Sequence, residues 1–255
     1  MSLIITTYVP EGIVMASDSR QSITIEGKTP DGKVLAKIDT VNSDNVCKTY
    51  LLAKKDNENK PIFEVGVSFF GDDLLGGISM VNHIKRFSEE KVTNIDDITT
   101  IPKKLVEFFR KLFPNANTGF HIVGYKKEKK GEVSEPYIYY CHILQNKVER
   151  KNLNKEKNLS YGATWSGVID VLNGILHPSL LPRSEGKFVT IHKPPIVWDR
   201  MALQDAIDFS IYAIRTTIDT IRFQARPKNV GGSIDVLVIT PDGANWIQRK
   251  ELKGE

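Results

Sequence analysis

The first twenty residues, MSLIITTYVPEGIVMASDSR, contain the side chains whose chemistry is easiest to interpret. Ser2 follows the initiator methionine, and Asp18 and Arg20 come at the end of an apolar run. A serine hydroxyl is a weak nucleophile until a base takes its proton. If Met1 is removed, the free α-amine of Ser2, with an ordinary pKa of about 7.7–8.0, can be that base. Two plainer interpretations exist: Asp18 and Arg20 form a surface ion pair, and Ser2 is a small residue that suits N-terminal processing or belongs to a vector-derived start.

Two predicted hairpins position these side chains. Leu3–Val9 and Ile13–Ser17 are apolar runs joined by Pro10-Glu11-Gly12, a sequence typical of a tight turn. We therefore expect a hairpin whose second strand ends at Asp18. Residues 21–41 predict a second, polar hairpin that turns at Pro30-Asp31-Gly32.

The other apolar patterns predict strands and helices in groups. Strands are expected at Val46–Ala53, Ile62–Phe70, Gly119–Tyr125, Tyr137–Leu144, near Val148, at Ile234–Thr240 and at Ala244–Arg249. Helical spacing of apolar residues predicts helices over residues 74–87, Leu105–Phe113, Gly167–Leu176 and Ala202–Phe223. Because the helices come in sequential pairs, a doubly wound parallel sheet is disfavoured. The order predicts an α+β sandwich of two antiparallel sheets with helices packed outside both.

Composition bounds the class of protein. The chain has 255 residues, of which 40% are hydrophobic and 26% charged, as in ordinary globular proteins. This length supports one large domain or at most two small ones. The net charge of +4 is spread along the sequence, and its densest basic stretch, residues 126–131, is expected to be a solvated hairpin tip. Nucleic-acid binding, which needs basic residues gathered on one face, is therefore not expected.

The cysteines and the N-terminus indicate where the protein works. Cys47 and Cys141 lie in apolar runs, so we expect buried, reduced thiols in a reducing compartment. No secretory signal peptide and no membrane-spanning run is evident, which predicts a cytoplasmic protein without a membrane partner. The histidines show no shared metal-ligand spacing and are expected to be structural or exposed: His83, His121, His142, His177 and His192. No metal or cofactor is predicted.

Two stretches carry a resemblance to a known family. ITTYVPEGIVMASDSR resembles the opening of proteasome β-type subunits, and VGGSIDVLVITPDGANWI resembles their late glycine pair, I-D-V strand and closing hairpin. With the element order between them, the resemblance covers most of the chain. It implies the N-terminal nucleophile (Ntn) hydrolase superfamily and a four-layer α-β-β-α sandwich. Residues 1–255 would then form a single domain.

The resemblance also implies a position for the nucleophile. In the family the acidic residue lies sixteen positions after the nucleophile, and sixteen positions before Asp18 is Ser2. Thr6 and Thr7 are only twelve and eleven positions away. At roughly 3.3 Å per residue, such a shift would move the nucleophile well away from the carboxylate. Ser2 is therefore the candidate.

The family's other site residues carry over with one ambiguity. A lysine beside the α-amine would lower the pKa of that amine, and Asp18 would hold the lysine in place. The usual family spacing indicates Lys33, with Lys37 nearby, but the local pattern favours Lys48, which leads into a strand. Arg20 would balance the carboxylate and tie the strand end to neighbouring backbone. The backbone N–H of Gly71, between a strand and a helix, could stabilise a tetrahedral oxyanion.

Departures from the family pattern keep other functions open. Family members carry an aspartate and a serine before the late glycine pair, where this sequence has Pro227 and Val230; Ser166 partly matches another family serine. The leading hypothesis is a proteasome-like hydrolase of peptide amide bonds that acts as a homo-oligomer, with a ring as one arrangement. The alternatives are a non-catalytic assembly or partner-binding subunit and a small-molecule amidase on the same fold. An ATPase partner is neither indicated nor excluded.

Overall fold

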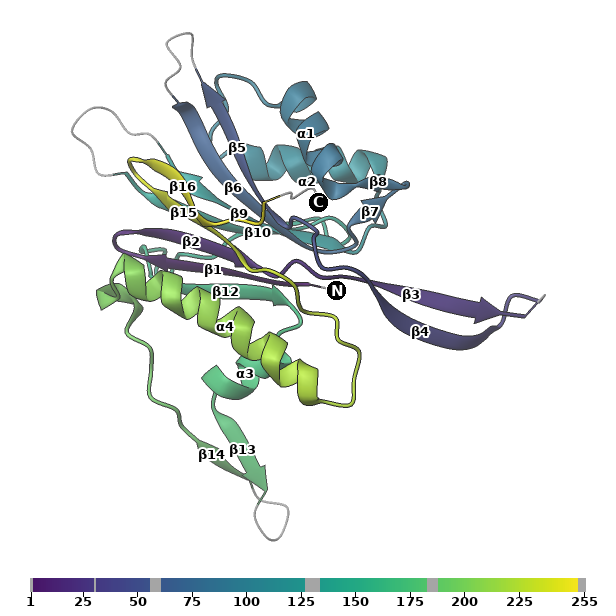
Figure 1. Cartoon of the computed structure of the whole chain (residues 1–255). Helices are drawn as coiled ribbons and strands as arrows, with labels where there is room; N and C mark the ends of the chain where they lie inside the picture. Colours follow the sequence, from purple (N-terminus) through teal and green to yellow (C-terminus); the bar gives the residue numbers. More distant parts are fainter. Residues whose placement is uncertain (1, 30, 56–60, 127–133, 183–187, 252–255) are drawn as a thin grey trace.

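Two five-stranded antiparallel sheets face each other across an apolar layer (Figure 1). The computed structural model describes residues 2–29, 31–55, 61–126, 134–182 and 188–251. The first sheet has the order β12 (Gly162–Gly167), β1 (Leu3–Val9), β2 (Gly12–Ser17), β15 (Asp235–Thr240) and β16 (Gly243–Gln248). The second has the order β11 (Lys147–Arg150), β10 (Pro136–His142), β9 (Thr118–Tyr125), β6 (Pro61–Gly71) and β5 (Thr49–Lys55).

Helices pack on the outer face of each sheet. α1 (Met80–Lys91) and α2 (Ile101–Leu112) share a core with the second sheet, and α3 (Asp170–Leu176) and α4 (Leu203–Phe223) share one with the first (Figure 1). A short 3-10 helix, η2 (Trp198–Arg200), precedes α4. The inter-sheet layer is built from side chains of both sheets: Tyr8, Ile13, Met15, Val123, Ile138, Leu237 and Ile239.

Strand, not helix, dominates the described chain, which corrects the expected fold class. About 42% of the described residues are in strands, and the described part has four α-helices. The α+β four-layer sandwich, with a full helical layer outside each sheet, is therefore wrong. The sequence pattern also began one helix too early: residues 74–79, assigned to a helix, form the small antiparallel pair β7 (Leu74–Leu75) and β8 (Ile78–Ser79). Gly76 and Gly77 turn between them with φ of 58° and 77°, a conformation that ends a right-handed helix.

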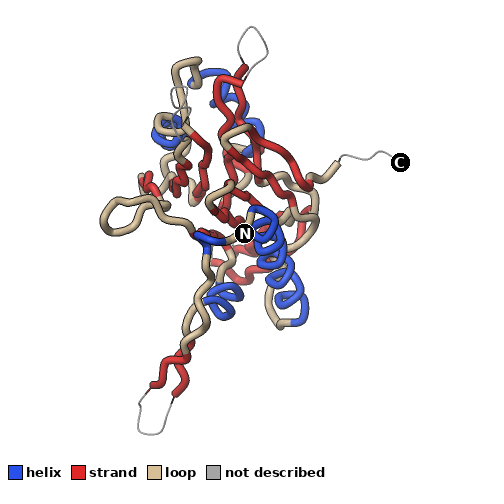
Figure 2. Tube along the Cα trace, turned by 90° about the vertical axis from the view of Figure 1, so that its left-hand side faces the viewer, coloured by secondary structure: helices blue, strands red, loops and turns tan. Residues whose placement is uncertain are grey.

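Two ribbons project from the body. β3 (Gln21–Lys28) pairs only with β4 (Val34–Ser43), and β13 (Ser179–Pro182) pairs only with β14 (Phe188–Ile191) (Figure 1). Figure 2 shows the β13–β14 ribbon extending from the lower end of the molecule. The β3–β4 ribbon confirms the hairpin expected over residues 21–41. The β13–β14 ribbon and β12 had no counterpart among the expected elements.

Three further expectations concern the basic hairpin tip, the two cysteines and membrane-spanning segments. Lys126 ends the described segment after β9, and residues 127–131 of the expected basic hairpin tip lie outside the described residues. Cys141 is buried and Cys47 is half-buried, and both are free thiols. Among the described residues, no helix combines the length and the apolar character that crossing a bilayer requires.

Candidate active site

Asp18 is the centre of a buried hydrogen-bond cluster at the end of β2. Its carboxylate is fully buried and accepts hydrogen bonds from the backbone N–H groups of Leu3 (2.9 Å), Arg20 (3.2 Å) and Gly231 (3.1 Å). The Lys48 ammonium donates a fourth at 2.7 Å. The end of an apolar strand is thus charged because three chain segments converge there on one carboxylate.

Lys48 lies directly before β5 and is almost completely buried, with 1% of its side chain exposed. Its Nζ donates to Asp18 Oδ1 at 2.7 Å and to the Arg20 carbonyl at 2.6 Å. Burial lowers the pKa of the Lys48 amine below its ordinary value, and the charge of Asp18 opposes that change. A buried lysine held against a carboxylate is an arrangement that can lower the pKa of a neighbouring amine.

Ser2 is buried beside this cluster. The carbonyl of Ser2 accepts a hydrogen bond from Val168 N–H at 2.9 Å, and the next residue, Leu3, donates to Asp18. The backbone on both sides of the Ser2 peptide group is therefore fixed. Met1 lies outside the described residues.

A cavity of about 360 Å³ lies against Ser2. It is lined mainly by polar residues: Ser2, Arg20, Gln21, Ser22, Thr24, Gly71, Asp72, Asp73 and Asn117. Gly71 adopts φ +96°, and a Cβ atom there would lie 2.0 Å from the carbonyl oxygen of Asn117. Only glycine fits this position, so the end of β6 can pass close to the Asn117 backbone at the wall of the cavity.

The Arg20 side chain is directed to Asp44, not to the carboxylate of Asp18. Its Nε and Nη2 donate to Asp44 at 2.5 and 2.7 Å, and its Nη1 donates to the Lys228 carbonyl at 2.9 Å. The hydrogen bond from Arg20 holds the pKa of Asp44 below its usual range. Arg20 therefore ties three segments together, and only its backbone contacts Asp18 directly.

The other candidate residues lie away from Asp18. Lys33 and Lys37 are on the projecting ribbon and pair there with Asp31 at 3.5 Å and Glu26 at 2.7 Å. The structure thus brings Lys48 to Asp18 and leaves Lys33 and Lys37 in solvent.

Thr6 and Thr7, which are close to Ser2 in sequence, are both buried inside β1. The Thr6 hydroxyl bonds His121 and the Thr7 hydroxyl bonds Ser210 on α4. Both hydroxyls serve packing between layers, and neither lies at a chain end.

His121, which was expected to be structural or exposed, is buried and bridges the two sheets, a contact that the sequence pattern did not predict. His121 on β9 bonds Thr6 Oγ1 through Nδ1 at 3.0 Å and Ser166 Oγ through Nε2 at 2.9 Å. Burial lowers the pKa of His121 to about 3, so the ring is neutral near pH 7. Ser166 precedes Gly167, which pairs with Leu3 next to Ser2. An isolated histidine in an apolar strand gave no signal for this contact, because its partners are more than forty residues away.

A second buried lysine near Asp18 was also missed. Lys250 donates to Asp235 at 2.5 Å, to Ser19 Oγ at 2.5 Å and to the Val46 carbonyl at 3.1 Å. It directly follows the last expected strand, Ala244–Arg249, among charged residues, and the sequence pattern gave it no role. This lysine fastens the last described residues to the segment that follows Asp18.

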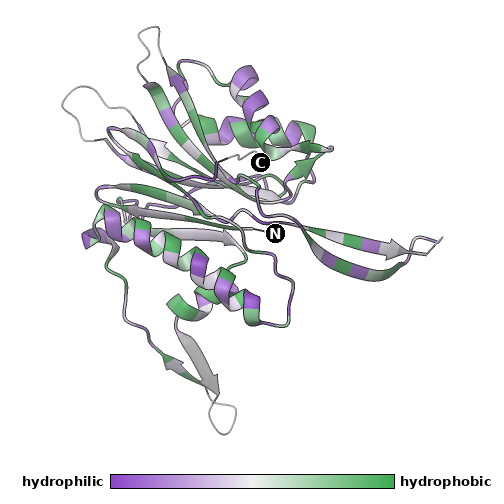
Figure 3. Cartoon of the chain, in the orientation of Figure 1, coloured by the Kyte–Doolittle hydropathy of each residue, from purple (hydrophilic) through white to green (hydrophobic). Residues whose placement is uncertain are grey.

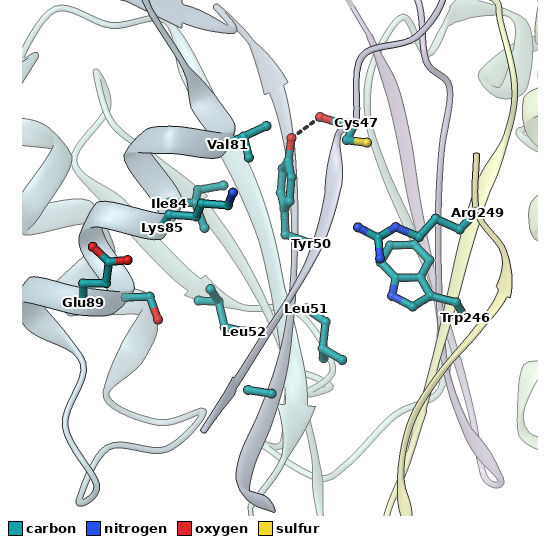
Figure 4. A pocket seen from close by; sticks show the side chains of 12 residues that line it. Cys47, Tyr50, Leu51, Leu52, Val81, Ile84, Lys85, Glu89, Trp246 and Arg249 are labelled. Carbon is teal, nitrogen blue, oxygen red and sulfur yellow. Dashed lines mark hydrogen bonds between the residues drawn. The ribbon is translucent and has the colours of Figure 1, made fainter. Parts of the chain in front are cut away.

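A larger cavity, of about 540 Å³, lies away from Ser2 between β5, α1 and β16 (Figure 4). Arg249 stacks over the Trp246 ring at 4.8 Å, and the Tyr50 hydroxyl donates to the Cys47 carbonyl. Neither Ser2 nor the Asp18–Lys48 pair lines it. Within the described ranges, no group of three or more His, Cys, Asp or Glu side chains is placed to hold a metal ion.

Comparisons with solved structures identify a similar fold. Anbu (ancestral beta-subunit) from Yersinia bercovieri matches with a TM-score of 0.59 and 14% identity, covering 96% of this chain and 86% of that one. An Anbu (Gly-1) mutant from Hyphomicrobium sp. strain MC1 matches with a TM-score of 0.61 and 14% identity over 98% and 86% of the two chains. Anbu from the same strain gives 0.56 and 13% over 98% and 88%. No family model and no curated protein sequence matches.

These matches correct the family suggested by the sequence motifs. The similar structures are Anbu proteins, which are proteasome-like but form a family distinct from the proteasome β-type subunits. The assignment to proteasome β-type subunits is therefore wrong at the family level. At 13–14% identity the similarity concerns the fold, and the chain has a proteasome-like fold.

Proposed function

We propose that the chain is an N-terminal serine hydrolase that cleaves peptide amide bonds after removal of Met1. The observation that carries this proposal is the Asp18 carboxylate, which binds both the Lys48 ammonium and the N–H of Leu3, the residue after Ser2. One carboxylate thus fixes a cation and the backbone of the proposed nucleophile. We also propose that residues 1–255 form one domain and, since both cysteines are free, that the protein is cytoplasmic.

The chemistry follows from the charges around Ser2. The free α-amine takes the proton of the Ser2 hydroxyl as its oxygen attacks the substrate carbonyl. The Lys48 cation favours the neutral form of that amine at working pH and stabilises charge on the hydroxyl oxygen. The amine then gives the proton to the leaving nitrogen, and water hydrolyses the acyl-serine ester.

The cavity supports the same assignment. The N–H of Gly71, at the wall of the cavity beside Ser2, is the proposed donor to the tetrahedral oxyanion. Removing one such donor typically slows turnover by about 10²–10³. The polar lining, with Asp72 and Asp73, suits an extended peptide backbone and polar side chains. Arg20, neutralised by Asp44, acts by holding the strand end.

Kinetics of the Ser2→Ala variant test the proposal. Protein produced from the native start should hydrolyse a panel of peptide amides, and Ser2→Ala should abolish turnover while the Tm stays within error. Ser88→Ala is the matched control, since Ser88 lines the other cavity, and it should keep full activity. Hydrolysis that survives in Ser2→Ala would refute the serine nucleophile. A substrate panel that also holds small amides separates a peptidase from a small-molecule amidase.

A non-catalytic role is the second candidate, and one observation favours it. Val230 is buried and Pro227 is exposed where the resembled family has a serine and an aspartate that support the nucleophile. Neither side chain offers a polar group to Ser2. Absence of any amide hydrolysis in protein that has lost Met1 would favour this role. An oligomer, with a ring as one arrangement, is proposed for either function.

A further inference from the structure

The β3–β4 ribbon has one apolar face that the described chain leaves open to solvent. Its register pairs Ile25 with Ile38, Ile23 with Thr40 and Gly27 with Ala36, which places these residues on one side. Ile25 is 53% exposed and Ile38 is 62% exposed. The alternation of hydrophobic and hydrophilic residues along both strands is visible in Figure 3.

The other face of the ribbon is mainly polar, although Val41, 43% exposed, lies on it opposite Ser22, and Leu35, 72% exposed, lies at the register shift near the tip. Thr24 donates to Asp39 at 2.5 Å, and Lys37 pairs with Glu26 at 2.7 Å. The ribbon is therefore amphipathic, like a strand pair that covers a core, yet it packs on no third strand. At its base Gln21 donates to Asp73 of the body, and Asn42 on β4 donates to Gln21 across the ribbon.

Such a ribbon needs a permanent cover. A two-stranded hairpin is marginally stable by itself in water, so a layer packed on its apolar face would stabilise it. A substrate or a transient partner would leave the isoleucines bare for most of the protein's lifetime. A second copy of the same chain, in contrast, is present whenever the protein is present.

The charges of the ribbon fit a second copy. Residues 21–43 hold three acidic side chains (Glu26, Asp31, Asp39) and three basic ones (Lys28, Lys33, Lys37), so the ribbon is neutral. A neutral surface gains little attraction from a nucleic acid or an anionic membrane. It also meets no net repulsion from a copy of itself.

The area of the apolar face indicates which arrangement of two copies would bury enough surface. Strands of 8 and 10 residues, at roughly 3.3 Å per residue and about 4.8 Å between strands, give each face of the ribbon roughly 300 Å². Two ribbons stacked face to face would bury about 600 Å² in total, below the roughly 1,200 Å² of specific interfaces. Two ribbons exchanged reciprocally, each lying on the body of the other copy, would bury about 1,200 Å².

We propose that the β3–β4 ribbon is an exchanged arm, whose apolar face with Ile25 and Ile38 packs on the body of a second copy of this chain. The arm joins the body at Gln21, Ser22 and Thr24, which also line the cavity at Ser2. Assembly and the open side of the cavity are therefore adjacent. The proposal is independent of whether Ser2 acts as a nucleophile.

The test is the oligomeric state of the full chain, measured by sedimentation velocity over a concentration series. Wild-type protein should be dimeric or larger at micromolar concentration. The double variant Ile25→Lys with Ile38→Lys should associate about 100-fold more weakly, tenfold for each buried isoleucine. Glu26→Gln with Asp39→Asn changes the net charge equally on the polar face, and it should associate like wild type.

A second variant guards against misfolding of the arm. Replacing residues 23–40 by a two-residue Gly turn removes the arm, and the remaining body should keep its Tm and be monomeric. A monomeric wild-type protein, or an oligomer unchanged by the lysine pair and by the deletion, would overturn the proposal. Flotation of wild-type monomer with phosphatidylcholine vesicles, lost in the lysine pair, would overturn it in favour of a lipid surface.

Discussion

Two lysine–carboxylate pairs in this chain have the same separation and opposite surroundings. Lys48 and Asp18 lie 2.7 Å apart with 1% and 0% of their side chains exposed. Lys37 and Glu26, on the projecting ribbon, also lie 2.7 Å apart, but Lys37 is 62% exposed. The pKa of Lys48 is lowered by burial, whereas the pKa of Lys37 is raised by its hydrogen bond to Glu26. Burial, and not distance, decides which lysine can tune a neighbouring amine.

The same contrast extends to the regions that hold the pairs. Asp18 accepts hydrogen bonds from three backbone N–H groups as well as from Lys48, so the buried pair is fixed from several sides. The ribbon pair is held by a hairpin that packs on no third strand. Substitutions in the two regions should therefore differ strongly in effect, and the following predictions begin with the largest.

Removing the buried Lys48 cation should cause the largest loss of unfolding free energy. Lys48→Met leaves the Asp18 carboxylate buried without its counter-charge, and breaking one side of such a pair costs about 3–5 kcal/mol of unfolding free energy. Urea unfolding measures this loss. Under the proposed function, any fraction that folds should also be inactive towards peptide amides. A Lys48→Met protein that is as stable as wild type would contradict the importance of the buried pair.

Two glycines with positive φ sharpen the comparison. Gly71 at the cavity has φ +96°, and a Cβ atom there would lie 2.0 Å from the carbonyl oxygen of Asn117. Gly32 in the ribbon turn has φ +82°, and a Cβ atom there would have no neighbour within 4 Å. Gly71→Ala should therefore lower the unfolding free energy by about 3 kcal/mol, from backbone strain and overpacking together. Gly32→Ala should lower it by only about 1 kcal/mol. Equal losses in thermal or urea unfolding would mean that crowding at Gly71 is unimportant.

The buried histidine should make the inter-sheet layer acid-sensitive. The folded pKa of His121 is about 3, below the ordinary value of about 6.5. Between these pH values the unfolded chain binds a proton that the folded chain does not, so stability falls as pH falls. The slope is about 1.4 kcal/mol per pH unit. In urea unfolding from pH 6.5 to 4.5, the slope for wild type should exceed that for His121→Asn by up to this amount; identical slopes would contradict the prediction.

Breaking the exposed Lys37–Glu26 pair should change the stability least. Lys37→Met removes one partner of a solvated ion pair on the ribbon, where each charge stays hydrated. The Tm and the urea midpoint should remain within error of wild type. A loss comparable to that of Lys48→Met would show that the ribbon pair is buried in the assembled protein.

The sequence predicted local features better than tertiary ones. The first hairpin, the ribbon over residues 21–41 and a helix ending at Phe223 follow from turn residues and apolar spacing. Helical spacing misled at residues 74–79, because two consecutive glycines turn the chain there. β12 was missed because GATWSG has neither alternation nor an apolar run.

Local sequence patterns could not predict contacts between residues far apart in the chain. Lys48 could be favoured from the local sequence that leads into β5, but its contact with Asp18 depends on how the two sheets meet. The pairing of Arg20 with Asp44, and that of Lys250 with Asp235, join surface-like charges by tertiary packing. The His121 bridge between Thr6 and Ser166 also depends on tertiary packing, so no periodicity in the sequence predicts it.

The most direct measurement is the intact mass of protein expressed from its native start, recorded before and after a peptide ester is added under turnover. The account predicts a chain that begins at Ser2 and an acyl adduct that tandem mass spectrometry assigns to Ser2. The adduct should be absent from Ser2→Ala. A chain that retains Met1 and shows neither adduct nor hydrolysis would contradict the account.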